Sequence, residues 1–230
     1  WQDELFRTAI TQNHNFSYSK RTDSGNYYAS LSYMDQEGIV ETSDFERTTA
    51  RLNAEESFFD NKRLKLKMNL TASQINENGI PNGANAGSDG QVIMHALMAN
   101  PTRSVFDENG DYTNFNMNAH YNPLYLLDIV EDKTETLRVL GNIEASLRII
   151  DGLEYKFNLG IDRSSSERNS TIYPNLTDRT PLGAYVQNNL DSQSALIEHY
   201  LTYNFDIGKN NFEILGGYSY QEFKFSGTSF

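Results

Sequence analysis

The chain alternates apolar and polar side chains most clearly over residues 63–73, RLKLKMNLTAS. One set of alternate positions is wholly apolar and consists of Leu64, Leu66, Met68, Leu70 and Ala72. The positions between them are all polar. Successive side chains of a β-strand point to opposite faces, so this period of two predicts a strand with one apolar and one polar face.

The same alternation predicts seven further strands. It recurs over residues 137–149 and 153–162, on either side of Asp151 and Gly152, a pair typical of a tight hairpin turn. Weaker copies span residues 13–19, 26–35, 47–55, 194–204 and 212–221. The pattern therefore predicts an all-β chain of eight antiparallel strands.

The connections between these strands alternate in length. Short connections span residues 21–25, 59–62, 151–152 and 207–211, and longer ones span residues 36–46, 74–136 and 163–193. Within the longest, apolar side chains at helical spacing predict one short helix over residues 91–100, ended by Pro101. Outer-membrane barrels segregate their connections in this way, with short periplasmic turns at one end and long extracellular loops at the other.

Composition and motifs narrow the possible functions. No run approaches the roughly 18 apolar residues that a transmembrane helix needs. The net charge of -12 argues against nucleic acid, because phosphate binding needs clustered Lys and Arg. The chain has no cysteine, which excludes disulfides and thiolate metal sites. Its four histidines lack the spacing of a metal site, and no catalytic or phosphate-binding motif occurs, so we expect neither an enzyme nor a cofactor.

Three architectures fit the strand pattern. A transmembrane barrel wall turns its apolar faces to lipid, whereas a soluble or surface-exposed β-sandwich that binds carbohydrate or mediates adhesion packs them between two sheets. A self-contained eight-stranded barrel is the third. The alternation also predicts that His199 faces lipid beside Ile197 and Leu201, unless the register shifts or the residue lies at the membrane interface.

Several motifs resemble the barrel region of SusC/RagA-type TonB-dependent transporters. In chain order they are WQDELFRTAITQNHNFSYS, NYYASLSYMDQEGIV, FERTTARLNAE, ALMANPTRSVFDENGDY, NPLYLLD and LTYNFDIGKNNFEILGGYSYQE. The resemblance implies that residues 1–230 form part of a transmembrane β-barrel domain, eight strands of a barrel of 22. The plug domain and the remaining strands would then lie outside this chain, and both of its ends are expected to be truncation points.

The resemblance also implies a function and partners. Transporters of this type take up nutrients, glycans or oligopeptides, across the outer membrane with energy delivered through TonB. They work with a SusD-like surface lipoprotein, and the segment that contacts TonB belongs to the N-terminal part that this chain lacks. Outer-membrane lipid would surround the barrel, and no nucleic acid is expected.

Charged side chains at alternate positions are predicted to line a watery lumen, because a charge costs about 2–4 kcal/mol at the lipid midplane. There they would hold either the plug domain or the passing substrate, and the sequence does not distinguish the two. These candidates are Arg47, Arg51, Lys65, Lys67, Arg138, Glu144 and Arg148. Aromatic side chains of the long loops are candidate contacts for sugar rings or peptide side chains, with packing of the loops against each other as the alternative. They are Tyr112, Phe115, Tyr121, Tyr125, Tyr173 and Tyr185.

Overall fold

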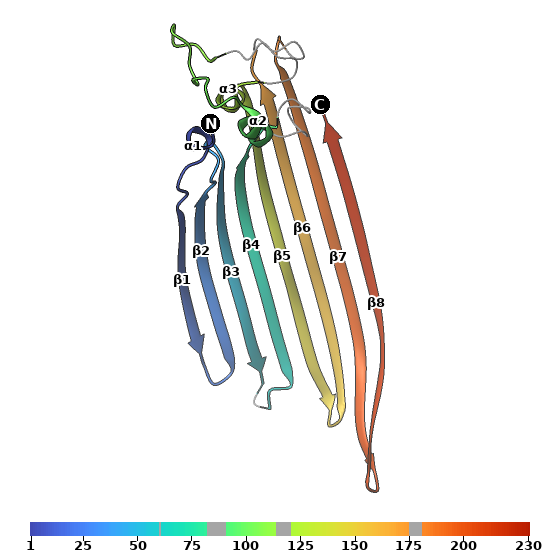
Figure 1. The fold of residues 1–230 in the computed structure, drawn as a ribbon. Helices are drawn as coiled ribbons and strands as arrows, with labels where there is room; N and C mark the ends of the chain where they lie inside the picture. The colour runs from blue at the N-terminus through green and yellow to red at the C-terminus, as the bar shows by residue number, and fades with distance from the viewer. Residues whose placement is uncertain (60, 82–90, 114–120, 175–180) are drawn as a thin grey trace.

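The structure is a computed structural model that describes residues 1–59, 61–81, 91–113, 121–174 and 181–230. Its main element is one sheet of eight strands, in which each strand pairs antiparallel with its neighbours in the chain (Figure 1). The strands are β1 Thr11–Arg21, β2 Gly25–Glu37, β3 Asp44–Phe58, β4 Leu64–Gly79, β5 Val130–Ile150, β6 Leu153–Ile172, β7 Ala184–Ile207 and β8 Asn210–Ser229. All eight predicted strands are confirmed.

Strands β6 and β7 are much longer than the alternation predicted. β6 runs to Ile172 and β7 begins at Ala184, so the prediction of a loop over residues 163–193 is wrong. Residues 163–170, RSSSERNS, are polar at every position, and no alternation marks them as a strand. Their backbone pairing continues nevertheless, with Arg168 opposite Asn188 and Ser170 opposite Val186.

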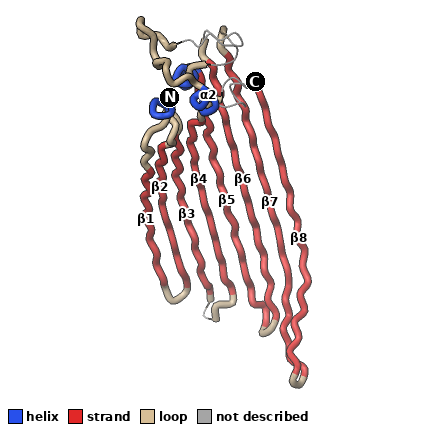
Figure 2. Tube along the Cα trace, viewed as in Figure 1, coloured by secondary structure: helices blue, strands red, loops and turns tan. Residues whose placement is uncertain are grey.

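The two ends of the sheet differ in their connections. The turn end carries the connections at residues 22–24, 59–63, 151–152 and 208–209, and the loop end carries those at 38–43, 80–129 and 173–183. Both chain termini and the helices lie at the loop end (Figure 2). The turns descend in steps from β1 to β8 in Figure 1, a stagger typical of strands that tilt around a barrel. The predicted segregation of short and long connections is therefore present.

Three short helices lie at the loop end. They are α1 Gln2–Leu5, α2 Val92–Met98 and α3 Pro123–Ile129. α2 confirms the helix predicted over residues 91–100, but the prediction of a single helix is wrong because α1 and α3 also form. α3 begins where the Asn122 side chain accepts a hydrogen bond from the Leu124 amide at 3.1 Å, with Pro123 in its first turn.

The helices share a small apolar core at the loop end. It consists of Leu5, Val40, Val92, Ala96, Leu126, Leu127, Ile129 and Val130. None of the described helices is long and apolar enough to cross a membrane. Since this core lies at one end, the sheet itself must be stabilised by its backbone pairing and by whatever covers its faces.

One face of the sheet, here the apolar face, carries the apolar rows. Directly paired residues share a face, and the register aligns Met68, Ile143, Leu159, Ile197 and Tyr220 in one row across β4 to β8. On β4 the apolar positions extend from Leu64 to Ala72, about 26 Å along the strand, which after tilting approaches the roughly 25 Å apolar band of outer-membrane barrels.

Aromatic rings gather on the apolar face towards the turn end. His199 pairs in register with Phe157 and Tyr218, and its ring lies 5.8 Å from that of Tyr218, so no register shift occurs. The Phe205 ring stacks on Tyr203 at 5.1 Å and on Phe212 at 5.5 Å. Aromatic residues form girdles at the interfaces of membrane barrels, and this cluster has the composition and place of one.

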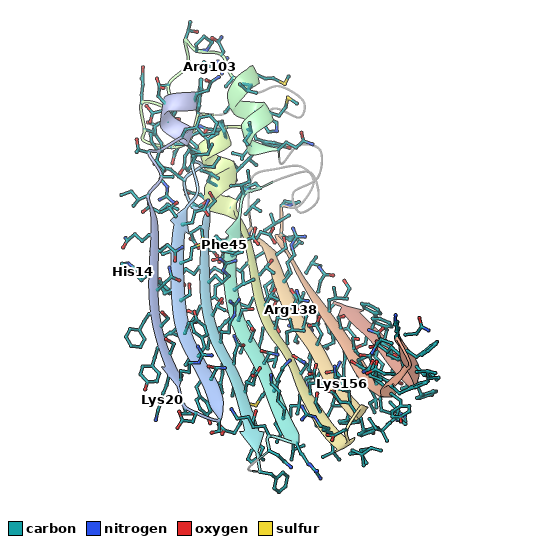
Figure 3. The ribbon with its side chains drawn as sticks, turned by 90° about the horizontal axis from the view of Figure 1, so that it is seen from below. His14, Lys20, Phe45, Arg103, Arg138 and Lys156 are labelled. Carbon is teal, nitrogen blue, oxygen red and sulfur yellow. The ribbon has the colours of Figure 1, made fainter. Side chains whose placement is uncertain are left out.

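No described element covers the apolar face. The main contact between a helix and the sheet is that of α3 with β5 at the loop end, and Figure 3 shows a single layer of strands with side chains on both sides. On that face Ile143 is 47% exposed and Leu159 is 37% exposed. A sandwich is excluded for the described residues, and so is a closed eight-stranded barrel, because β1 pairs only with β2 and β8 only with β7.

The apolar face is compatible with lipid and not with water. Each half-exposed large apolar side chain costs on the order of 1 kcal/mol in water. Over eight strands the total would reach on the order of 20 kcal/mol, which exceeds the net stability of about 5–15 kcal/mol of a typical domain. The sheet therefore requires an apolar environment on this side.

Adjacent substitutions on β4 test the assignment of the two faces. Leu70→Arg places a guanidinium on the apolar face, and in a bilayer it should lower the unfolding free energy of the full-length protein by about 2–4 kcal/mol. Thr71→Arg, on the opposite face, should cost less than about 1 kcal/mol. Urea unfolding in lipid vesicles measures both values. Equal losses would show that the two faces meet the same environment.

Candidate functional site

The candidate site is the polar face of the sheet, opposite the apolar face. All seven charged candidates lie on it, because the register aligns Glu55, Lys67 and Glu144 in one row and Arg148 opposite Glu154. In the same way Arg51 stands opposite Thr71, and Arg138 stands opposite Ser73. The parity of the strands thus brings the predicted residues together on one surface. That this surface lines a lumen stays a prediction.

Exposed ion pairs occupy the polar face towards the turn end. Lys65 Nζ lies 2.7 Å from Glu55 Oε1, and Lys67 Nζ lies 3.4 Å from Glu144 Oε1. The four side chains retain 30–39% of their accessible surface. Pairs as exposed as these contribute roughly 0–1 kcal/mol each, because water screens them. They keep the surface hydrated and can exchange partners at little cost.

A row of side-chain amides that ends on the Glu198 carboxylate crosses the middle of the polar face. Asn69 Nδ2 donates to Asn142 Oδ1 at 3.0 Å, Asn142 Nδ2 donates to Asn158 Oδ1 at 3.4 Å, and Asn158 Nδ2 donates to Glu198 Oε2 at 3.1 Å. Ser219 Oγ then donates to the other oxygen of Glu198 at 3.2 Å. The row joins five strands, and its amides can donate to and accept from water, sugar hydroxyls or peptide groups. The alternation placed these residues on the polar side but gave no signal of the ladder itself.

Above the amide row the polar face carries a second charged group. The Arg138 guanidinium donates two hydrogen bonds to the Asp162 carboxylate, from Nε at 3.0 Å and from Nη2 at 2.7 Å. Arg47 Nη2 lies 3.7 Å from Met34 Sδ. Within the described part of the chain, neither Arg47 nor Arg51 forms an ion pair. These two candidates therefore carry uncompensated positive charge into the space over the sheet.

A partly buried ion pair joins β5 and β6 on the polar face at the loop end. Arg168 donates to both oxygens of Asp132, at 2.8 and 2.7 Å, and only 7% of Asp132 is exposed. The hydrogen bonds to Asp132 raise the pKa of Arg168, so the guanidinium stays charged. Gly79 lies against this pair, since a Cβ there would come within 2.9 Å of the carboxylate. Sequence reasoning missed this clamp because residues 163–193 were predicted to be a loop.

Three of the six loop aromatics pack within the loop-end structure. The Tyr112 ring lies 5.0 Å from Phe106 and 5.5 Å from Tyr125, and its hydroxyl donates to Asp128. Burial, aided by this hydrogen bond to Asp128, raises the pKa of Tyr112 to about 12. The Tyr121 ring lies 6.0 Å from that of His95. These contacts agree with the packing alternative for these side chains.

The other loop aromatics stand apart from this group. Tyr173 Oη donates to Glu131 at 3.1 Å, and Tyr185 Oη donates to Asn169 at 2.8 Å. Tyr185 follows the parity of Ile197 along β7, so it lies on the side of the apolar face, beyond the apolar rows. Phe115 lies outside the described residues. As ligand contacts, all six aromatics remain predictions.

Comparison with known proteins finds relatives that are TonB-dependent receptors. No family model matches the chain. Over 99% of its length, the chain is 30% identical to the TonB-dependent receptor P3 of Formosa agariphila and covers 23% of that protein. Over the same share of its length, it is 30% identical to the TonB-dependent receptor SusC of Bacteroides thetaiotaomicron and covers 24% of that protein. The structure of the RagAB peptide transporter matches all of this chain at 27% identity with a TM-score of 0.78, over 26% of that chain. The chain therefore spans about a quarter of the length of the relatives that it matches.

The clamp between Asp132 and Arg168 yields a stability prediction. Arg168→Gln removes the two charged hydrogen bonds that the buried Asp132 carboxylate accepts from the guanidinium and should lower the stability of the loop end by about 2 kcal/mol. The double variant with Asp132→Asn should recover part of this loss, because the buried charge is gone. Hydrogen exchange at the amides of α3 and the start of β5 in the full-length protein measures the change. Arg163→Gln, an exposed arginine on the same strand, is the control, and equal protection in all variants would contradict a role for the clamp.

Proposed function

We propose that the whole protein imports an oligomeric nutrient, a glycan or an oligopeptide. The proposal starts from the correspondence of this chain to about a quarter of a SusC/RagA-type TonB-dependent receptor, within its outer-membrane barrel. The observation that carries the proposal is the division of the sheet into two faces. One face requires an apolar environment, and the other is hydrated and lined by charges and amides. A wall with this division separates a membrane from an aqueous passage.

The proposed architecture places the polar face on a lumen. Residues 1–230 form eight strands of the barrel domain, and other parts of the protein supply the remaining strands, to a total of 22, and a plug domain. The short turns then lie in the periplasm, and the helices and long connections lie at the cell surface. In this orientation the loop-end core and the Asp132 clamp stand at the outer mouth.

The proposed lumen wall suits a hydrophilic solute. Its candidates are the seven charged residues Arg47, Arg51, Lys65, Lys67, Arg138, Glu144 and Arg148, with the amide row between them. Because the ion pairs towards the turn end are exposed and weak, their charges can turn to a passing solute without a large loss of stability. Amides and exposed charges together can hydrogen-bond sugar hydroxyls as well as peptide groups.

The proposed partners follow from the family. A SusD-like surface lipoprotein would cover the outer mouth, and TonB would supply energy through a part of the protein outside this chain. A solved relative is described as the RagAB peptide importer in a 'closed-closed' and an 'open-open' state. Tyr173 and Tyr185 have exposed rings at the loop end and are candidate contacts there, with Tyr185 on the side of the apolar face.

The second function considered, a carbohydrate-binding or adhesive sandwich, has no observation in its favour. A sandwich needs a second sheet over the apolar face, and the described residues form one sheet only. We therefore retain uptake as the single proposal.

Deletion of the full-length gene tests the proposal. The deletion strain should lose growth on one class of glycan or oligopeptide, while growth on the corresponding monomer is unchanged because monomers can enter by other routes. Plasmid-borne wild type should restore growth, and a protonophore should abolish uptake of the labelled oligomer. Normal growth and uptake on every oligomer of a broad panel would contradict import.

A further inference from the structure

A basic hollow lies on the polar face at the turn end, between β4, β5 and β6. Its cations are Lys62, Arg63, Lys65, Lys67, Arg148 and Lys156. Among the described residues, the acidic side chains that line it are Glu144 and Glu154. Acidic residues outnumber basic ones 31 to 19 in the chain, yet six of those 19 cations surround this one hollow. Positive charge is therefore concentrated here against the composition of the protein.

The charges of the hollow are only partly compensated. Three of the six cations are paired: Lys65 lies 2.7 Å from Glu55, Lys67 lies 3.4 Å from Glu144, and Lys156 lies 3.6 Å from Glu154. Arg63 and Arg148 form no ion pair with any described residue, although the Arg148 amide bonds to the Arg63 carbonyl at 2.8 Å and so holds the two strands side by side. Like charges gathered in this way repel each other over a Debye length of about 8 Å at physiological salt. An anion placed among them would relieve that repulsion.

The size of the hollow limits what it can hold. Its volume is about 210 Å³, below the roughly 300–1,000 Å³ of sites that enclose a whole small molecule. It accommodates one anionic group with its water, while the rest of a larger solute stays outside.

We propose that this basic hollow binds single anionic groups, carboxylates above all, on the oligomers that pass along the wall, and so gives the passage a preference for acidic solutes. The inference rests on the proposed function, because it concerns the solute of the proposed lumen. In the proposed orientation the hollow lies near the periplasmic ends of β4, β5 and β6. There it would attract an anionic oligomer towards the exit.

The test uses the full-length receptor purified in detergent. Two pairs of probes separate the sources of the carboxylate: an oligogalacturonate with a neutral galacto-oligosaccharide, and a glutamate-containing peptide with its glutamine counterpart. Arg63→Gln/Arg148→Gln should weaken binding of an anionic probe about tenfold at low salt and leave its neutral counterpart unchanged. The difference should vanish at high salt. Arg163→Gln, which removes an arginine from the other face, is the matched control and should behave as wild type.

The remaining outcomes decide against the inference. Equal loss for charged and neutral probes, or no loss for either acidic probe, would overturn it. A salt-dependent fall in the Tm of the empty receptor without a probe-specific loss would assign the hollow to an acidic segment of the protein itself, which also overturns it. Arg63→Lys/Arg148→Lys should restore binding if charge alone is needed. The growth phenotype of the gene deletion is independent of these readings, so import can stand where the anion preference fails.

Discussion

The pairing of every strand's backbone N–H and C=O groups is the constraint on which the rest of the structure depends. Hydrocarbon offers these groups no partner, and an unpaired one costs several kcal/mol there. Seven antiparallel ladders satisfy them between neighbouring strands of this sheet, with one register shift between Arg148 and Ile150, and the outer edges of β1 and β8 are left for strands outside the described residues. With the backbone paired in this way, the side chains are free to divide by face. The apolar rows towards lipid and the charged and amide rows opposite them are both consequences of that division.

The limited height of the apolar band explains the pattern of apolar and polar residues along the longer strands. Where a strand crosses lipid, only one face can be polar, and a period of two results. Beyond Ile161 on β6 both faces meet water, so the following residues, Arg163 to Ser170, are polar throughout while their ladder to β7 continues. The same strands therefore serve as a membrane wall over one part and as a support for the loop-end helices over another. The clamp of Asp132 and Arg168 lies in this upper part.

The sequence alone predicted the features that follow from the alternation of apolar and polar residues along each strand. The face of Lys65 or Arg138 follows from its parity in the strand, and the register confirmed that the charged candidates share one surface. Strand ends at Ile172 and Ala184 could not be predicted, because no change in hydropathy marks them. α3 was missed because it is only two turns long and runs directly into β5. The ion pair of Asp132 with Arg168 and the basic hollow depend on residues far apart in the chain, which only the register brings together.

The accessibility of successive β4 positions to lipid and to water tests the division of the two faces most directly. This chain has no cysteine, so single cysteines can be introduced from residue 64 to residue 73 of the full-length receptor, with any cysteine elsewhere replaced. In intact outer membranes, a fluorophore at Leu66, Met68 and Leu70 should be quenched by nitroxide-labelled lipid. Cysteines at Lys67, Asn69 and Thr71 should instead react with a water-soluble reagent and escape lipid quenching. Protection of the Leu66, Met68 and Leu70 positions from lipid, or equal behaviour of both sets, would contradict the account.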